Sequence, residues 1–152
     1  MPGTLVGMDL DIKLGLRLLS LHQAVYQASD GRIGHHLLGV PCLLIRTTGR
    51  RSGRIRTAAL AYGRDGADYL VVGSVGGDDR APGWLHNLRA RPEIGVQVGR
   101  RRFAAVATIV EAGDPDHARL WRVMNDDIGG RYDRYQARTT RRIPVVRLTP
   151  LR

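Results

Sequence analysis

The sequence is poor in lysine, cysteine and aromatic residues. Lys13 is the only lysine, although 24 lysines and arginines face 14 aspartates and glutamates and the formal net charge is +10. The positive charge is therefore almost all arginine, which binds phosphate and carboxylate through paired hydrogen bonds. Cys42 is the only cysteine, so no disulfide can form within the chain. We expect an anionic partner and a reducing compartment.

Further absences exclude whole classes of protein. No apolar run approaches the roughly 20 residues that a transmembrane helix requires. The first residues also lack the charged segment and apolar segment of a secretory signal, so a cytoplasmic location is expected. Neither G-x-G-x-x-G after a strand nor G-x-x-x-x-G-K-[ST] occurs, which disfavours a parallel nucleotide-binding sheet.

Metal and hydrolase chemistry are also disfavoured. The five histidines show no metal-ligand spacing relative to one another, to the cysteine or to carboxylate clusters, so no metal is expected. No convincing serine, histidine and acid set appears, and no pair of catalytic carboxylates. An enzymatic role would therefore have to depend on a bound organic cofactor.

The pattern of apolar residues predicts one domain over residues 1–152, with two parts. Residues 1–30 are predicted to be helical, because leucines and a valine recur on one face between Asp9 and Ala28. This amphipathic helix is expected to pack on the core. A peripheral contact with the inner face of the cell membrane is the alternative for the same helix.

Residues 40–149 are predicted to form a barrel. Short apolar strands separated by turn residues, without regular βαβ alternation, are typical of a mainly β, antiparallel fold with peripheral helices. About six strands are expected, at Val40–Arg46, Ile55–Tyr62, Tyr69–Val72, Ile94–Val98, Phe103–Val110 and Ile143–Leu148, with helices at Ala81–Ala90 and Pro115–Asn125.

An arginine-rich turn joins the first two predicted strands. It combines two glycines, hydroxyl side chains and four arginines, which are the ingredients of a phosphate or polycarboxylate cradle. A solvated hairpin tip is the alternative interpretation. The candidate ligands for an anion are Arg50, Arg51, Ser52, Gly53, Arg56 and Thr57.

Two small segments could complete a cofactor site. Ser74, Val75, Gly76 and Gly77 follow a predicted strand, where small residues let a flat ring or an anionic oxygen approach the backbone. An ordinary glycine-rich connection is equally compatible with that segment. The second segment spans 82–88 and offers Pro82, Trp84 and Asn87; its tryptophan could be core, a stacking surface, or both.

Tyr132 and Tyr135 are three residues apart, so on a helix they share a face. Two phenols beside a pocket could stack on a substrate and donate a proton or hydrogen bond to a developing oxyanion. Amphipathic packing is the alternative.

In this order, the segments resemble the deazaflavin-dependent nitroreductase family of split β-barrel, FMN-binding-like proteins, which use reduced coenzyme F420. The matching motifs lie at 44–57, 73–77, 82–88, 91–93, 135–139 and 143–146. The resemblance implies hydride transfer from reduced F420 to an electron-poor acceptor such as a quinone, enone or nitroaromatic. It implies that the residues named in the arginine turn and in segments 74–77 and 82–87 bind the cofactor. It further implies that Tyr132, Tyr135 and Ser74 serve catalysis.

The chain departs from the family pattern at two positions that bear on specificity. Val75 stands where the family often has lysine, and Ala61 where an aromatic residue lines the pocket in the best-known branch, so a reshaped acceptor site is expected. FMN is the alternative cofactor, and a non-enzymatic module that binds cofactor or nucleic acid is the alternative function. Nucleic acid is disfavoured because aromatic residues make up only 5% and no reader motif occurs. A monomer or a homodimer is expected.

Overall fold

The computed structural model describes residues 36–37, 40–126 and 128–151. The strands are β1 His36–Leu37, β2 Val40–Thr48, β3 Ile55–Ala61, β4 Gly63–Asp65, β5 Asp68–Val72, β6 Glu93–Val98, β7 Arg101–Val110 and β8 Val145–Pro150. The helices are the short 3-10 turn η1 Val75–Gly77, then α2 Gly83–Ala90, α3 His117–Asp126 and α4 Arg131–Gln136.

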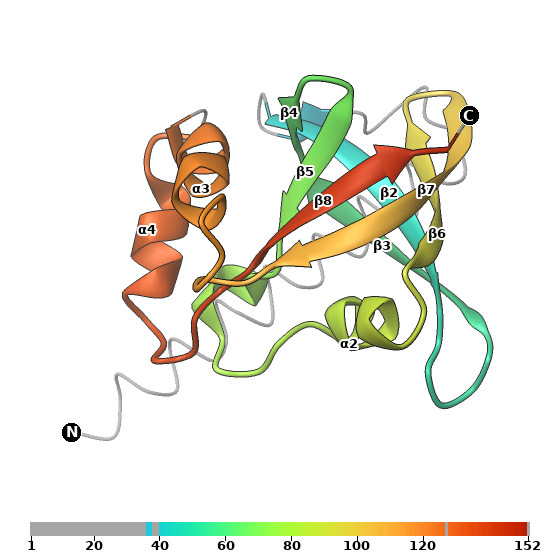
Figure 1. Cartoon of the computed structure of the whole chain (residues 1–152), viewed down its shortest axis with the longest axis horizontal. Helices are drawn as coiled ribbons and strands as arrows, with labels where there is room; N and C mark the ends of the chain where they lie inside the picture. Colours follow the sequence, from blue (N-terminus) through green and yellow to red (C-terminus); the bar gives the residue numbers. More distant parts are fainter. Residues whose placement is uncertain (1–35, 38–39, 127, 152) are drawn as a thin grey trace.

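The strands form one antiparallel, strongly curved sheet that closes only partly. Its hydrogen-bonded order is β1-β2-β6-β7-β8-β5-β4, and β3 pairs with β2 outside this path. Among the described strands β3 bonds to β2 alone, so the barrel is split between β3 and the β4–β5 hairpin. The β2–β3 hairpin extends beyond the rest of the sheet at the lower right of Figure 1.

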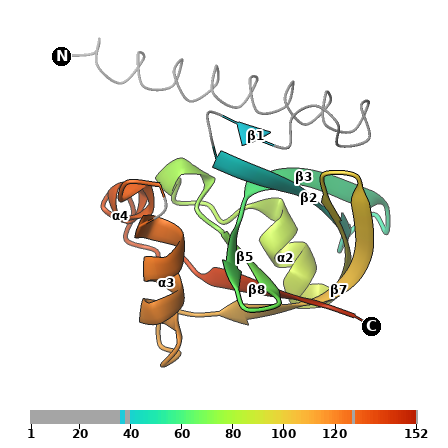
Figure 2. The ribbon, with the colours of Figure 1, turned by 90° about the horizontal axis from the view of Figure 1, so that it is seen from above.

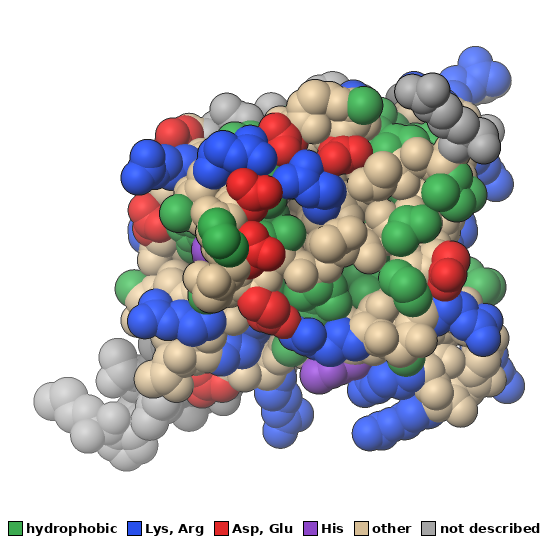
Figure 3. All heavy atoms as spheres, viewed as in Figure 1, with side chains coloured by type: hydrophobic (Ala, Val, Ile, Leu, Met, Phe, Trp, Pro, Cys, Tyr) green, Lys and Arg blue, Asp and Glu red, His purple; other side chains and the backbone are tan. Residues whose placement is uncertain are grey.

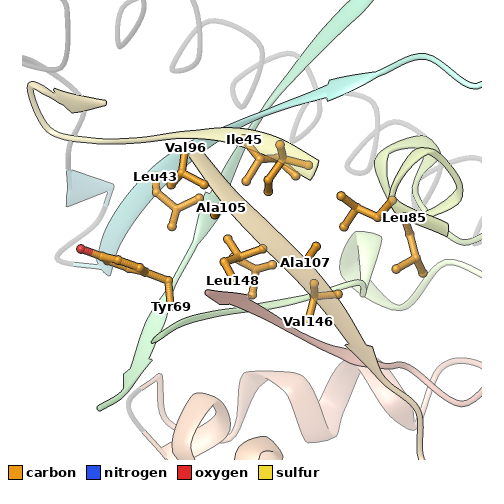
Figure 4. Packing of buried hydrophobic residues seen from close by; sticks show 12 residues of the cluster. Leu43, Ile45, Tyr69, Leu85, Val96, Ala105, Ala107, Val146 and Leu148 are labelled. Atoms are coloured by element: carbon orange, nitrogen blue, oxygen red, sulfur yellow. The ribbon is translucent and has the colours of Figure 1, made fainter. Parts of the chain in front are cut away.

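The inside of the barrel is filled by alternate residues of five strands and closed by α2. Leu43 and Ile45 of β2 are buried completely, and Leu85 and Leu88 of α2 pack into the same cluster. Figure 4 shows Leu43 and Ile45 converging with side chains of other strands, and Leu85 of α2 beside them. Seen from above, α2 lies within the curve of the strands (Figure 2). Burial of this apolar surface holds α2 in place.

A second cluster lies on the outer face of β5 and β8. Leu70 and Val72 of β5 point away from the barrel interior and pack with Leu120 and Met124 of α3, and with Tyr132 of α4. This explains the unbroken apolar run 69–72, because a strand buried on both faces does not need polar alternation. The helices α3 and α4 therefore lie together at one end of the sheet (Figure 1).

The predicted fold class is confirmed, with differences in detail. Each predicted strand is present within two residues, but the sheet has two further strands, β1 and β4, which are too short to produce a recognisable pattern. The helix α4 was not predicted as an element, although the shared face of its tyrosines was. The predicted N-terminal helix, and any membrane contact made by it, lies outside the described residues.

An ion-pair cluster ties the β4–β5 hairpin to β8 and α3. Arg147 donates hydrogen bonds to Asp65 at 2.9 Å and to Asp68 at 3.0 Å. Arg119 of α3 donates two further hydrogen bonds to Asp65, at 3.0 and 3.1 Å. The hydrogen bonds from Arg119 and Arg147 lower the pKa of Asp65 from its ordinary 3.8 to about 2.

This shift predicts how stability depends on pH. Because the pKa of Asp65 is lowered on folding, its stabilising contribution should be complete above about pH 4 and should vanish as the pH falls towards 2. Asp65→Asn should therefore lower the urea midpoint of unfolding at pH 6. The difference in midpoint between the variant and wild type should disappear as the pH falls towards 2. Asp126→Asn is the control, because Asp126 forms no ion pair among the described residues. A gap independent of pH would contradict this role for Asp65.

Candidate functional site

The arginine-rich turn is a tight, internally bonded loop. Gly49 donates its N–H to the carbonyl of Arg54 at 2.7 Å, and Gly53 donates to the carbonyl of Gly49 at 2.8 Å. Gly53 has a φ of +69°, which favours glycine because a Cβ would be strained there. With the loop closed by its own backbone, the side chains of Arg50, Arg51 and Ser52 are exposed.

A buried amide attaches this turn to α2. The side-chain oxygen of Asn87 accepts hydrogen bonds from the backbone N–H and from Nη1 of Arg50, both at 3.1 Å. The amide nitrogen of Asn87 donates to the hydroxyl of Thr47 at 3.1 Å. Asn87 is 5% exposed and Thr47 is fully buried, so these bonds satisfy polar groups that would otherwise be costly to bury. Nη1 of Arg50 also reaches the carbonyl of Gly83 at 3.4 Å.

Turn and helix together enclose a groove of about 350 Å³. Its described lining contains three arginines and no acidic residue, and Trp84 presents a half-buried ring to it. The space-filling view shows basic side chains projecting along the lower edge of the molecule, where the β2–β3 turn and α2 lie (Figure 3). The lining residues are Gly49, Arg50, Arg51, Ser52, Arg56, Thr57, Ala58, Gly83, Trp84 and Asn87.

The segment after β5 has an unusual backbone. Ser74 is right-handed, whereas Val75, Gly76 and Gly77 have φ values of +43°, +61° and +87°. A right-handed residue followed by left-handed ones turns successive N–H groups to one side and forms a concavity that binds anions. The N–H groups of Val75 and Gly76 make no hydrogen bond within the described part of the chain. Val75 is strained, since a β-branched residue rarely adopts a positive φ.

The Ser74 hydroxyl is available as well. Ser74 is only 8% exposed, yet its hydroxyl makes no hydrogen bond with any described group. Leu85 of α2 packs within 3.3 Å of the position that a Cβ on Gly73 would occupy. The segment therefore lies against the same helix that carries Trp84 and Asn87.

Residues after α4 hold this segment from its other side, and sequence reasoning missed them. Arg141 donates to the carbonyls of Ser74 and Asp78, both at 3.1 Å, and Arg138 donates to the carbonyl of Gly76 at 3.3 Å. The hydroxyl of Thr139 donates to Asp79 at 2.6 Å. With these carbonyls engaged, the free N–H groups are left for a ligand. The motif at 135–139 was the only indication in the sequence.

The two tyrosines occur as expected on one face of α4, but in different surroundings. Tyr132 is 6% exposed and its burial raises the pKa of the phenol to about 12, so the phenol keeps its proton at neutral pH. Its hydroxyl has no hydrogen-bond partner among the described residues. Tyr135 is half-buried, and the two rings meet edge to face at 6.0 Å.

Tyr132 lines a small apolar cavity of about 60 Å³ together with Ala61, Tyr62 and Met124. The cavity would hold about two water molecules, taking roughly 30 Å³ for each. It lies farther along β3 than the groove, since Ala58 lines the groove and Ala61 lines the cavity, three residues or about 10 Å apart along a strand. The expectation of a reshaped acceptor site beside Ala61 stays a prediction.

A further hollow of about 750 Å³ lies elsewhere, lined mainly by residues of α3 and α4. Its central polar groups bond to one another: Asp133 accepts from Nε1 of Trp121 at 2.7 Å and from the amide of Asn125 at 2.9 Å. The backbone N–H of Asp133 donates to Asn125 in return. This network connects α4 to α3, and we assign it to holding α4 rather than to chemistry.

The structure thus divides the predicted site residues into three groups. The first group lines one groove and consists of Arg50, Arg51, Ser52, Arg56, Thr57, Trp84 and Asn87. Gly53 lines a separate hollow beside the same turn. Ser74, Val75, Gly76 and Gly77 form the second group, and Tyr132 and Tyr135 the third. Pro82 is buried at the start of α2 and lines none of these hollows. The described residues contain no cluster of histidine, cysteine or acidic side chains that could bind a metal.

The chain is similar to known proteins in sequence and in fold. The model of a family described as F420H(2)-dependent quinone reductase matches residues 18–150. A Mycobacterium tuberculosis protein named F420H(2)-dependent quinone reductase is 50% identical over 141 residues, covering 92% of this chain and 95% of its own. The solved structure of an F420-H2 dependent reductase, FDR-A, is 32% identical with a TM-score of 0.64, covering 74% and 97%. A structure described as a domain-swapped dimer is 28% identical with a TM-score of 0.66, covering 84% and 96%.

No helix in the described residues is long and apolar enough to cross a membrane.

The contact between α4 and the Ser74 segment gives a test of the geometry. A Cβ at Gly77 would lie 2.5 Å from the carbonyl oxygen of Tyr135, whereas one at Gly53 would meet nothing within 4 Å. Both glycines have positive φ, so each alanine should cost about 1 kcal/mol in backbone strain. Gly77→Ala should cost at least about 1 kcal/mol more than Gly53→Ala, because backbone must move. Thermal unfolding measures both, and equal losses would show that α4 does not press on Gly77.

Proposed function

The chain belongs to the F420H(2)-dependent quinone reductase family, and we propose that it transfers a hydride from reduced F420 to a quinone or a similar electron-poor acceptor. The observation that carries the assignment of the site is the acid-free groove between the arginine turn and α2. F420 bears a phosphate followed by an acidic tail, and this groove presents three arginines to such a group.

Three features of the chain fit this cofactor. Arg50 is held in place by Asn87, so part of the cost of ordering its side chain is met before the ligand arrives. The exposed guanidinium groups of Arg51 and Arg56 have no ion-pair partner in the described structure, which leaves them for phosphate oxygens. The unpaired N–H groups at Val75 and Gly76 offer neutral donors to the linker or head group.

The deazaflavin supplies the hydride, and the protein contributes position and protons. Trp84 would form a wall of the binding groove, and the buried hydroxyl of Ser74 would donate to an oxygen of the ring system or linker. Val75 would contact the cofactor with its exposed side chain. Such a role would explain why a strained β-branched residue occurs there.

Tyr132 is our candidate for the group that assists reduction of the acceptor. Its phenol is buried, protonated at neutral pH and without a partner in the described residues, so it can donate a hydrogen bond to an oxygen that gains negative charge. The cavity beside it has room for the oxygen end of an acceptor but not for a whole ring. Tyr135, on the same helix face, would border the acceptor nearer the surface.

FMN and nucleic acid are the competing ligands for a basic groove. Membership of an F420-dependent family favours F420 over FMN. Separate titrations with F420, FMN and duplex DNA compare the three directly, using deazaflavin or flavin fluorescence and DNA anisotropy. Tight binding of F420 alone supports the proposal. Absence of F420 binding at micromolar protein contradicts it, and DNA binding that falls steeply with salt would indicate a nucleic-acid module.

Loss of the groove arginines should separate binding from folding. Arg50→Ala combined with Arg56→Ala should weaken F420 binding by roughly 10- to 100-fold, because two charge-assisted contacts are lost at about 1 kcal/mol or more each. The matched control is Arg100→Ala with Arg122→Ala, which removes the same charge from exposed positions outside the groove. Calorimetry or fluorescence gives the affinity, and thermal unfolding the stability. An equal loss of affinity in both variants would show that the groove arginines act only through the overall charge of the protein.

Removal of the Tyr132 hydroxyl should affect turnover but not folding. Tyr132→Phe deletes a group that makes no hydrogen bond in the described structure, so the unfolding temperature should not fall. The kcat for menadione reduction should drop by roughly 10- to 100-fold while the affinity for F420 stays constant. Because the pKa of Tyr132 is about 12, this deficit should be the same from pH 6 to pH 9. An unchanged kcat would remove Tyr132 from the mechanism.

A further inference from the structure

The first turn of α4 takes its cap from α3, which lies beside it in Figures 1 and 2. The helix α4 has six residues, and a helix of this length is not stable by itself. Its N-cap is Gly130, which has no side chain to accept from the unpaired N–H groups of the first turn. The side-chain oxygen of Asn125, in α3, accepts instead from the backbone N–H of Asp133 at 3.0 Å. Asn125 therefore caps α4 from a neighbouring helix.

The carboxylate of Asp133 directs both of its oxygens to α3. Oδ1 accepts from Nε1 of Trp121 at 2.7 Å, and Oδ2 accepts from the amide of Asn125 at 2.9 Å. Asn125 is 7% exposed, so the loss of a partner would leave a buried polar group unsatisfied. The direction of these bonds is fixed, because a carboxylate only accepts and an indole only donates. Together with the cap they set where the first turn of α4 lies on α3.

Trp121 is itself held by further contacts. Its ring stacks on His117 with centroids 5.5 Å apart, and Nε2 of His117 lies 2.9 Å from the carbonyl oxygen of Ile143. Trp121 also packs against the ring of Tyr132, with centroids 6.1 Å apart. The indole thus contacts two consecutive residues of α4, Tyr132 with its ring and Asp133 with its N–H.

No polar contact fixes the phenol end of Tyr132. The residue is buried, and its hydroxyl has no hydrogen-bond partner among the described residues. Its direction therefore follows from the packing of the ring and from the backbone of α4. Asp133 is the next residue, so a shift of its backbone N–H moves Tyr132 as well. A hydrogen bond weakens steeply when its donor is misaligned, and a displacement of about 1 Å can cost roughly 100-fold in rate.

We propose that Trp121, Asn125 and Asp133 are positioning residues, which hold α4 so that the Tyr132 hydroxyl reaches the oxygen of the acceptor. This inference rests on the proposed function, in which Tyr132 assists reduction. The described lining of the cavity beside Tyr132 includes none of the three. They therefore act through Tyr132 and not on the acceptor itself.

The role predicts that the effect of Trp121 depends on the Tyr132 hydroxyl. Trp121→Phe keeps an aromatic ring and deletes the donor to Asp133. With F420 saturating, the kcat for menadione reduction should fall roughly 5- to 20-fold, because a hydrogen-bond donor is displaced. In a Tyr132→Phe background the same substitution should leave kcat almost unchanged, because the hydroxyl that it displaces is already absent. A merely structural role would lower kcat by the same factor in both backgrounds.

Asp133→Asn gives a second test, which includes a rescue. Either orientation of the new amide places a donor opposite a donor, of Trp121 or of Asn125, so one hydrogen bond is lost and kcat should fall. Adding Asn125→Asp exchanges the two side chains. The new carboxylate can accept from the backbone N–H and from the new amide at position 133, whose oxygen still faces Trp121. This exchange variant should therefore recover most of the lost kcat.

The experiment measures kcat for menadione in Trp121→Phe, Asp133→Asn and the exchange variant, each with and without Tyr132→Phe. Arg119→Gln is the matched control, because it removes two hydrogen bonds that join α3 to Asp65 and none that joins α3 to α4. Its kcat should stay close to that of wild type. Thermal unfolding shows whether each variant is folded.

Three outcomes overturn the positioning role. They are an equal effect of Trp121→Phe with and without the Tyr132 hydroxyl, an unchanged kcat in both Trp121→Phe and Asp133→Asn, and an equal loss in Arg119→Gln. A folded exchange variant without recovery of kcat would also contradict it. If the exchange variant does not fold, the Trp121 comparison decides alone.

These results leave hydride transfer from F420 intact. An unchanged kcat in Tyr132→Phe would remove Tyr132 from the mechanism and this inference with it, while F420 binding and turnover would still stand. Failure of wild type to bind F420 overturns the proposed function itself.

Discussion

The buried amide of Asn87 is the contact on which the geometry of the site depends. It hydrogen-bonds to Thr47 at the end of β2 and to Arg50 in the arginine turn. Its own helix, α2, is anchored in the core by Leu85 and Leu88. An arginine-rich hairpin without this contact would be a solvated tip. With it, the turn is fixed against a helix and encloses a groove, because a satisfied buried amide tolerates little displacement.

Polar contacts also fix the segment from Ser74 to Gly77. The carbonyls of Ser74 and Gly76 accept hydrogen bonds from Arg141 and Arg138, which follow α4. The helix α4 is in turn attached to α3 through Asp133, Trp121 and Asn125. Arginine therefore has two roles in this chain: some guanidinium groups stabilise backbone, and others are left uncommitted around a groove.

Much of the fold was predictable because the local signals were strong. Apolar runs such as 69–72 predicted strands, and the register of β2 with β3 follows from the turn between them. Two-residue and three-residue strands gave no periodic pattern, and neither did the single turn and a half of α4. Of the site, the ligand types in the arginine turn were recognisable. Arg138 lies in the matching motif at 135–139, but the hydrogen bonds of Arg138 and Arg141 to the Ser74 segment could not be predicted from the sequence.

Residue composition and spacing were enough to predict an antiparallel barrel and an arginine-rich turn suited to an anionic cofactor. Residue types and spacing suffice for this because turn chemistry and side-chain charge are local properties. Within the described residues, only the folded arrangement shows which arginines have no ion pair, that Tyr132 is buried without a hydrogen-bond partner, and that two hollows share Arg50. Burial and pairing depend on segments far apart in the chain, such as Arg50 with Asn87, and no local pattern encodes them.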